Sequence, residues 1–338
     1  MLSRCRYSLS LAALCLGCTL ATPVSAQTHQ PIGKIADQEV RHIATYFPGR
    51  MAGSPAELMM ADYVNQRFRQ MGYDSNLRDF KTRYLYRDSN GKNSWHNVTA
   101  TSVIAAKVGH SAKQILIVAH LDTFTPQSDD DVNHNLGGLT LQGADDNASG
   151  IGVMLELAER LRTVKTQVGI RFLALSAQEL GGKGIENYLS RMTPEEKKNT
   201  LLVIGIDSLI SGDKLLATSN AQALAERSRD RLLQLAKRDG IHIARGNSAM
   251  LDQSPPQNEG MALFSQAGLP LLLLSAADSQ DPTRQTRHGG SLFAQGTSWH
   301  QPQYDNMKYL DRHLPGRIRA RTREGVRILL PLLEQLAR

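Results

Sequence analysis

Short apolar runs alternate with longer amphipathic segments along this chain, and this alternation constrains its fold more than any other feature. Residues 115–119 are apolar throughout, which is typical of a strand buried on both faces of a sheet. Further runs of strand length occupy residues 98–105, 169–176, 201–206 and 269–274. Segments with helical spacing cover residues 148–161, 184–192 and 221–238. This order predicts an α/β fold with a mainly parallel central sheet and helices on both faces.

A further helix is predicted to begin at Ser54, because serine caps helices and Pro55 suits the first helical position. Its apolar face would consist of residues that recur at helical spacing, namely Leu58, Ala61, Val64 and Phe68. The polar residues 123–142 are predicted to form a loop after the central strand.

The first 26 residues have the pattern of a secretory signal peptide. Arg4 and Arg6 form a basic start, residues 9–21 are apolar but too short to span a bilayer, and residues 24–26 fit a cleavage site. We therefore expect export to the periplasm or the medium, with a mature chain that begins at Gln27 and has no later membrane span. No Gly-, Ser- or Pro-rich linker divides residues 27–338, which are predicted to form a single domain.

Removal of this peptide changes charge and cysteine content. Loss of Arg4 and Arg6 lowers the formal charge from +7 to +5, and the 39 Lys and Arg residues are scattered among 32 acidic ones, which argues against nucleic-acid binding. All three cysteines, Cys5, Cys15 and Cys18, lie in the peptide, so burial of a core must stabilise the mature chain. A lipid anchor on Cys18 is an alternative, although Cys15 stands where such signals usually have an aliphatic residue.

Chemically reactive side chains follow the apolar runs. His120 and Asp122 follow the central run, Glu179 and Asp207 follow two others, and residues 143–150 open a predicted helix. The carboxyl ends of parallel strands meet at one edge of a sheet, so these groups should lie together. Each alone has an ordinary explanation, since an aspartate before a helix is usually a cap. Imidazole and carboxylate without thiol form a ligand set for zinc, cobalt or manganese.

The motifs 119–122, 143–150, 176–179, Asp207 and 298–300 resemble those of the M28 zinc aminopeptidases. The resemblance extends over the whole mature chain. It implies a phosphorylase/hydrolase-like α/β fold that holds two divalent ions, with zinc as the expected metal.

Carried over by motif, the resemblance implies that His120 and Asp207 hold one metal, that Glu179 and His300 hold the other, and that Asp146 bridges them. Asp122 would orient the imidazole of His120 from behind. Asp145 is a competing bridge, although a supporting role for it is the preferred interpretation. A shared carboxylate offsets the repulsion of two dications, and a water between them loses a proton near neutral pH.

One position departs from the family, which has a glutamate as general base where this chain has Gln178. An amide can accept a hydrogen bond from water but cannot take its proton, and loss of a general base costs about 10²- to 10⁴-fold in rate. Three explanations remain open. The enzyme relies on metal-bound hydroxide alone, a carboxylate such as Asp145 or Glu259 substitutes, or the protein binds metal without cleaving.

The expected function is removal of N-terminal residues, with arginine the preferred residue by resemblance, from peptides or proteins that include an exported alkaline phosphatase. The alternative is a catalytically silent metal-binding protein of the same fold. Serine-hydrolase and nucleotide chemistry lack support, because the chain has no Gly-x-Ser-x-Gly motif and no phosphate loop. Two interpretations apply to residues 129–131 and His134, a rim of the substrate cleft or, preferably, a solvated acidic loop.

Overall fold

The structure is a computed structural model that describes residues 30–251, 260–277 and 300–338. Residues 31–338 belong to one compact unit. The predicted signal peptide, its cysteines, Glu259, Ser298 and Trp299 lie outside the described residues.

The described strands form one eight-stranded sheet in the order β1-β2-β4-β3-β5-β8-β6-β7. The strands are β1 (Asp74–Arg87), β2 (Asn93–Lys107), β3 (Gln114–His120), β4 (Gly169–Leu175), β5 (Thr200–Asp207), β6 (Lys214–Ser219), β7 (Ile243–Arg245) and β8 (Leu271–Ala277). All seven residues of β3 are buried, and β3 pairs in parallel with both β4 and β5, which confirms the predicted central strand.

Antiparallel pairing occurs toward the two sides of the sheet, so the sheet is mixed, although its centre is parallel as predicted. The antiparallel pairs are β1 with β2, β2 with β4, and β6 with β8. A short turn over residues 88–92 joins β1 to β2, and such a short connection can link only antiparallel strands. Strand β1 was not predicted, because charged side chains interrupt its apolar pattern.

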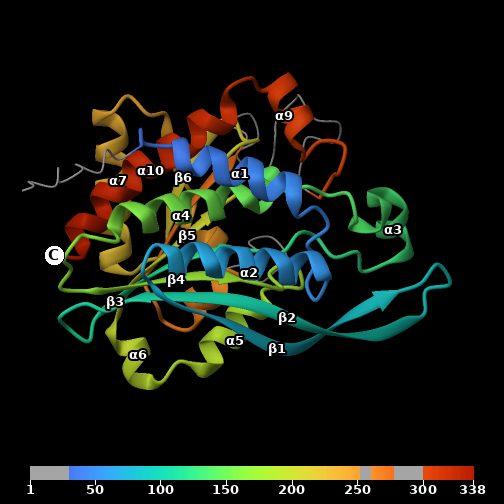
Figure 1. Cartoon of the computed structure of the whole chain (residues 1–338). Helices are drawn as coiled ribbons and strands as arrows, with labels where there is room; N and C mark the ends of the chain where they lie inside the picture. The colour runs from blue at the N-terminus through green and yellow to red at the C-terminus, as the bar shows by residue number, and fades with distance from the viewer. Residues whose placement is uncertain (1–29, 252–259, 278–299) are drawn as a thin grey trace, which may run out of the picture. The chain divides into compact units, whose positions relative to one another are not determined.

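The helices lie on both faces of the sheet, as predicted (Figure 1). They are α1 (Lys34–Tyr46), α2 (Pro55–Gln70), α3 (Asp129–Asn135), α4 (Ser149–Leu161), α5 (Lys183–Arg191), α6 (Pro194–Asn199), α7 (Ala223–Arg238), α8 (Ala262–Gln266), α9 (Met307–His313) and α10 (Arg317–Leu336). Short turns of other helix types are η1 (Leu136–Gly138), η2 (Ala144–Ala148) and η3 (Ser248–Leu251). No helix within the described ranges is both long and apolar enough to cross a membrane.

Two hydrophobic cores sandwich the sheet, and β3 contributes to both. Ile115 and Ile117 pack with α1, α2, α4, α7 and α10, whereas Leu116 and Val118 pack with α5 and α8 on the other face. This alternation follows from the two-residue period of a strand, which sends successive side chains to opposite faces. It fixes the carboxyl ends of the central strands at one edge of a rigid layer.

Two local predictions need correction. Leu58 is 51% exposed, whereas Ala61, Val64 and Phe68 are fully buried, because the buried stripe of α2 begins on another side of its first turn. Residues 123–142 are not entirely a loop, since they contain α3 and η1. The Ser128 hydroxyl accepts a hydrogen bond from the Asp131 N–H at 3.0 Å, which starts α3 in a polar sequence that has no apolar periodicity.

Candidate metal centre

The five predicted metal ligands come together at the carboxyl ends of the central strands. His120 and Asp207 are the last residues of β3 and β5, Glu179 follows β4, and Asp146 lies in η2. His300 approaches from a segment that is distant in the chain. The structure brings the four groups that precede His300 to one edge, three of them from strand ends and Asp146 from the turn before α4.

Asp146 lies between the two imidazoles. Its Oδ1 is 3.0 Å from His120 Nε2, and its Oδ2 is 3.8 Å from His300 Nε2. His120 Nε2 also lies 3.6 Å from Asp207 Oδ1, and His300 Nε2 lies 2.7 Å from Glu179 Oε2. His120 Nε2 also lies 3.9 Å from Glu179 Oε1, so Glu179 faces both imidazoles and Asp146 lies between them.

The chemistry of these donors fits divalent metal. Ligand atoms of His120, Asp146 and Glu179 all lie within 4.8 Å of one another, and all three residues are buried. Nitrogen of imidazole and oxygen of carboxylate are the ligands that zinc takes in catalytic sites. A cation here would offset the repulsion between carboxylates that burial has removed from water.

The titration of the donors reflects this crowding. Burial and then the charge of Glu179 raise the pKa of Asp146. Burial opposes protonation of His120, but hydrogen bonds with Asp122, Asp146 and Asp207 prevail and raise its pKa well above the ordinary value. A proton therefore competes with metal for this imidazole, and metal binding should release it.

Tight turns aim the donors. Ala177, Ser208 and His300 have φ values of 55°, 46° and 59°, in the left-handed region that residues with a side chain seldom adopt. Each is a predicted ligand or lies within two residues of one, as expected of strain held at a functional site. Gly150 is required for a different reason, because a Cβ there would lie 2.4 Å from the carbonyl oxygen of Ile206.

Asp122 serves both the imidazole and the next turn. His120 Nδ1 lies 2.9 Å from the backbone oxygen of Asp122 and 3.6 Å from its carboxylate. The same carboxylate accepts hydrogen bonds from the backbone N–H groups of Gln178 and Glu179, each at 3.1 Å. Asp122 therefore orients His120 mainly through its main chain and fixes the turn that carries Glu179.

The two candidates for general-base chemistry that the structure describes have structural partners. Gln178 is buried, and its Oε1 accepts a hydrogen bond from the Ile185 N–H of α5 at 3.2 Å. The carboxylate of Asp145 accepts bonds from the N–H groups of Ile210 and Ser211, at 2.7 and 3.0 Å. Burial, opposed by these bonds, raises the pKa of Asp145 to about 6. Asp145 thus supports the turn after β5, as preferred from the sequence.

Sequence reasoning missed Arg50, a fully buried cation behind the site. Its guanidinium donates to the carbonyl oxygens of Leu121, Gln142 and Gly143 at 2.8, 2.5 and 2.7 Å. Burial lowers its pKa to about 10, while nearby carboxylates oppose that effect, so it stays charged at neutral pH. Arg50 joins the segment that carries His120 to the segment that carries Asp146.

Asp305 was also missed. It is fully buried and accepts hydrogen bonds from the backbone N–H groups of Asp145 at 2.7 Å and Asp146 at 3.1 Å. Burial and then the charge of Asp145 raise its pKa well above the ordinary value. No spacing in the sequence marks Arg50 or Asp305, because a buried charge looks the same as an exposed one in a polar segment.

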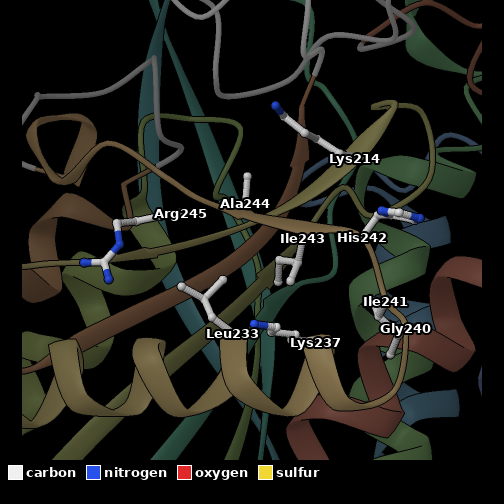
Figure 2. A pocket seen from close by; sticks show the side chains of 9 residues that line it. All are labelled: Lys214, Leu233, Lys237, Gly240, Ile241, His242, Ile243, Ala244 and Arg245. Carbon is white, nitrogen blue, oxygen red and sulfur yellow. The ribbon is translucent and has the colours of Figure 1, made fainter.

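A pocket of about 760 Å³ lies elsewhere, between β7 and α7. Figure 2 shows its lining, which includes Lys214, Lys237, His242 and Arg245. None of the five predicted ligands contributes to it, and it offers no carboxylate. This pocket is therefore separate from the metal centre, which we identify from its donor residues.

Imidazoles and carboxylates at the strand ends of an α/β sheet are the donor set expected of a metal-dependent hydrolase. Comparison with known proteins identifies the family. The model of peptidase family M28 matches residues 102–326, so the chain belongs to this family and is a metallopeptidase.

Individual relatives agree. The alkaline phosphatase isozyme conversion protein of Escherichia coli K12 is 48% identical over 337 residues, which cover 97% of each chain. Aminopeptidase YwaD of Bacillus subtilis 168 is 31% identical over 116 residues, which cover 33% of this chain and 22% of that protein. The solved structure of BSAP, a zinc aminopeptidase from Bacillus subtilis, aligns with a TM-score of 0.67 at 15% identity and covers 91% of this chain and 96% of that one. This last likeness confirms the fold.

Proposed function

We propose that this protein is an exported aminopeptidase that uses two divalent ions, with zinc as the metal. His120 and Asp207 would hold one ion, Glu179 and His300 the other, and Asp146 would bridge them. The observation that carries the proposal is the position of Asp146, whose two carboxylate oxygens each approach a different imidazole.

When bound, the metal pair would supply a water of lowered pKa and a Lewis acid for the substrate's α-amine or carbonyl group. The protein's own residues set the geometry. Asp122 and Arg50 hold the main chain around His120, and Asp305 holds the backbone of Asp146. Gln178 can orient a water by a hydrogen bond but cannot accept its proton, so this step lacks the family's usual base.

The substrate proposal rests on the family resemblance and on the name of the Escherichia coli relative. We infer that the protein removes an N-terminal arginine or a similar residue from exported proteins, including an alkaline phosphatase. Residues 1–26 would act as the export signal, and residues 27–338 would form the single mature domain in the periplasm or medium.

Hydrolysis of aminoacyl chromogenic amides by the zinc-loaded protein tests this function, with arginine amide as the first substrate. Gln178→Glu isolates the base, because a glutamate oxygen can still accept the bond from Ile185 N–H. We expect its kcat to rise by about 10²-fold or more, equivalent to about 2.7 kcal/mol, with KM and metal content unchanged. Gln335→Glu, the same change at an exposed position near the end of α10 and away from the metal edge, should give no such gain.

Gln178 itself favours one alternative, a metal-binding protein that no longer cleaves. If neither the natural chain nor Gln178→Glu cleaves any aminoacyl amide while carrying its metal, the aminopeptidase proposal is wrong and this alternative replaces it. If the natural chain is already fast and Gln178→Glu changes nothing, another group acts as base, and Glu259→Gln is the next variant to measure.

A further inference from the structure

The hairpin of β1 and β2 extends far beyond the sheet. Strand β2 pairs with β4 only over Val103–Lys107, whereas its pairing with β1 continues to Asn93 opposite Arg87. Val103 lies opposite Ala174, one residue before β4 ends, so residues 93–101 project past the edge that carries the metal donors. At about 3.3 Å per residue this projection is about 30 Å long. Figure 1 shows the hairpin running past the sheet on the side of α3.

One face of this arm is covered near its base and the other is open. Phe80 and Ala100 are buried, with Tyr84 and Val98 packed against the same cluster. The opposite face carries Leu85 and Trp95, a cross-strand pair with exposures of 42% and 56%. The guanidinium of Arg83 lies 4.4 Å from the centre of the Trp95 ring.

The open face is also basic. The distal part of the arm, residues 81–87 and 93–99, contains no carboxylate, and Asp79 near the base is exposed on the same face as Lys81. We define the outer face of the arm by its exposed cations and apolar side chains, which are Lys81, Arg83, Leu85, Arg87 and Trp95. An aromatic ring beside arginine is the composition of binding hot spots, and the cations favour an acidic partner.

Hydrogen bonds fix the arm to the metal centre through the loop that contains α3. Asp129 accepts bonds from Tyr86 Oη and the Ser89 N–H, both at 2.6 Å. Gln127 in the same loop donates from Nε2 to the carbonyl oxygen of Glu179 at 3.2 Å. The ring of Phe124 stacks on His300, with 3.9 Å between ring centres.

The acidic loop is solvated only in part: Asp130 and His134 are exposed, as expected, whereas Asp129 and Asp131 are half-buried and hydrogen-bonded. The carboxylates of Asp129 and Asp131 bind the arm and the Gln127 N–H, respectively, and hold the loop between arm and site. A partner bound to the arm would consequently stand in a fixed position relative to the donors.

We propose that the outer face of the arm docks the folded body of a protein substrate whose matching surface is acidic with an apolar centre. This proposal rests on the proposed aminopeptidase function. An aminopeptidase site engages the first few residues of its substrate, each of which spans at most about 3.6 Å, so an arm of about 30 Å reaches well past them. The arm is therefore placed to contact the part of a protein that follows its extended N-terminus.

A pair of matched substrates tests the proposal. One is a folded acidic monomer with an unstructured ten-residue N-terminal extension, about 35 Å long when extended. The other is that extension as a free peptide, and both begin with the residue that the zinc-loaded enzyme removes fastest. Trp95→Ala and Arg83→Glu should lower kcat/KM on the folded substrate by about 10-fold or more, through KM, and leave the peptide unchanged. Val108→Ala is the control, because it also removes an exposed apolar side chain, one that is 89% exposed and lies outside the arm. It should leave kcat/KM unchanged on both substrates.

Equal losses on both substrates would assign the arm a structural role and overturn the proposal, as would no loss on either. Titration of the folded substrate against metal-loaded protein gives a readout that does not need cleavage. If no form of the protein cleaves anything, the proposed function fails. Weaker binding by Trp95→Ala than by Val108→Ala would still support docking, whereas equal binding would overturn it.

Discussion

Arg50→Met should weaken both the fold and the binding of metal. Methionine fills much of the space of the arginine side chain but has no hydrogen-bond donor. The carbonyl oxygens of Leu121, Gln142 and Gly143 therefore lose the hydrogen bonds that the guanidinium donates to them. Gln142 and Gly143 come directly before η2, and Leu121 lies between His120 and Asp122. The change therefore loosens the link between the two segments that carry His120 and Asp146.

The magnitude follows mainly from these three lost bonds, since the fourth, from Nη1 to the Phe47 carbonyl oxygen, is long at 3.4 Å. Each buried acceptor left without a donor costs about 1–3 kcal/mol, and water entering the vacated space reduces that cost toward its lower end. We expect a total of about 3–5 kcal/mol, which is large beside a usual stability of about 5–15 kcal/mol. At about 2 °C per kcal/mol for a chain of this size, Tm should fall by about 6–10 °C.

The assay measures Tm of the metal-free protein and zinc affinity by competition with a chelator, for Arg50→Met and for Arg229→Met. Arg229 is also buried, but it bonds Ser219 on β6, opposite the amino-terminal half of β8 and so away from the metal edge. We expect Arg229→Met to lower Tm only. Arg50→Met should in addition weaken zinc binding by about 10-fold or more, as loss of a supporting contact does elsewhere.

Two outcomes would refute this reasoning. An unchanged Tm for Arg50→Met would mean that its hydrogen bonds contribute little net stability. A lowered Tm with unchanged zinc affinity would mean that the main-chain segments around His120 and Asp146 hold their positions without the guanidinium.

Three other predictions concern metal and pH. His300→Ala should lose about one of two divalent ions per chain in elemental analysis after zinc loading, whereas the exposed His313→Ala should lose none. Zinc at about 100 times its Kd should raise the stability of chelated protein by about 2.7 kcal/mol, and an unchanged Tm despite confirmed binding would contradict a site built from distant segments. Burial raises the pKa of Glu57 to about 9 from an ordinary value near 4.5, so the native state keeps a proton that the unfolded chain releases. The contribution of Glu57 to the free energy of unfolding is complete below about pH 4.5 and declines as the pH rises toward 9. The Tm of Glu57→Gln minus the Tm of the natural chain should therefore increase over that range. A difference that does not change with pH would show that Glu57 does not titrate in this way.

The elements that could be predicted from the sequence are those with a regular pattern of apolar residues. The apolar runs of β3, β4, β5 and β8 predict buried strands. The reactive side chains that follow three of these runs, His120, Glu179 and Asp207, are predicted from their position at the strand ends. Strand β1 has no such signal, because most of it lies in a two-stranded arm with little core to bury. His300 follows only from the resemblance, since it approaches from a segment outside the central strands.

Buried charge explains why the supporting residues escaped prediction. Arg50 and Asp305 are both fully buried, and both act on main-chain groups that lie far away in sequence. A hydrophobic pattern predicts which apolar side chains are buried. It does not predict the burial of polar side chains whose hydrogen-bond partners are backbone atoms. Such residues can be recognised only when the tertiary structure brings their partners together.

The charge of the centre favours divalent metal. Six buried carboxyl groups lie at or beside it, those of Asp122, Asp145, Asp146, Glu179, Asp207 and Asp305, whereas the buried guanidinium groups that face them are those of Arg50 and, beside Asp145, Arg321. Burial raises the pKa of Asp305 well above the ordinary value, so it adds the least negative charge, yet the other carboxyl groups still outnumber the two cations. Uncompensated charge in a buried site costs several kcal/mol, which divalent ions bound by these donors would offset. The donors could then keep their crowded positions without protonation of His120.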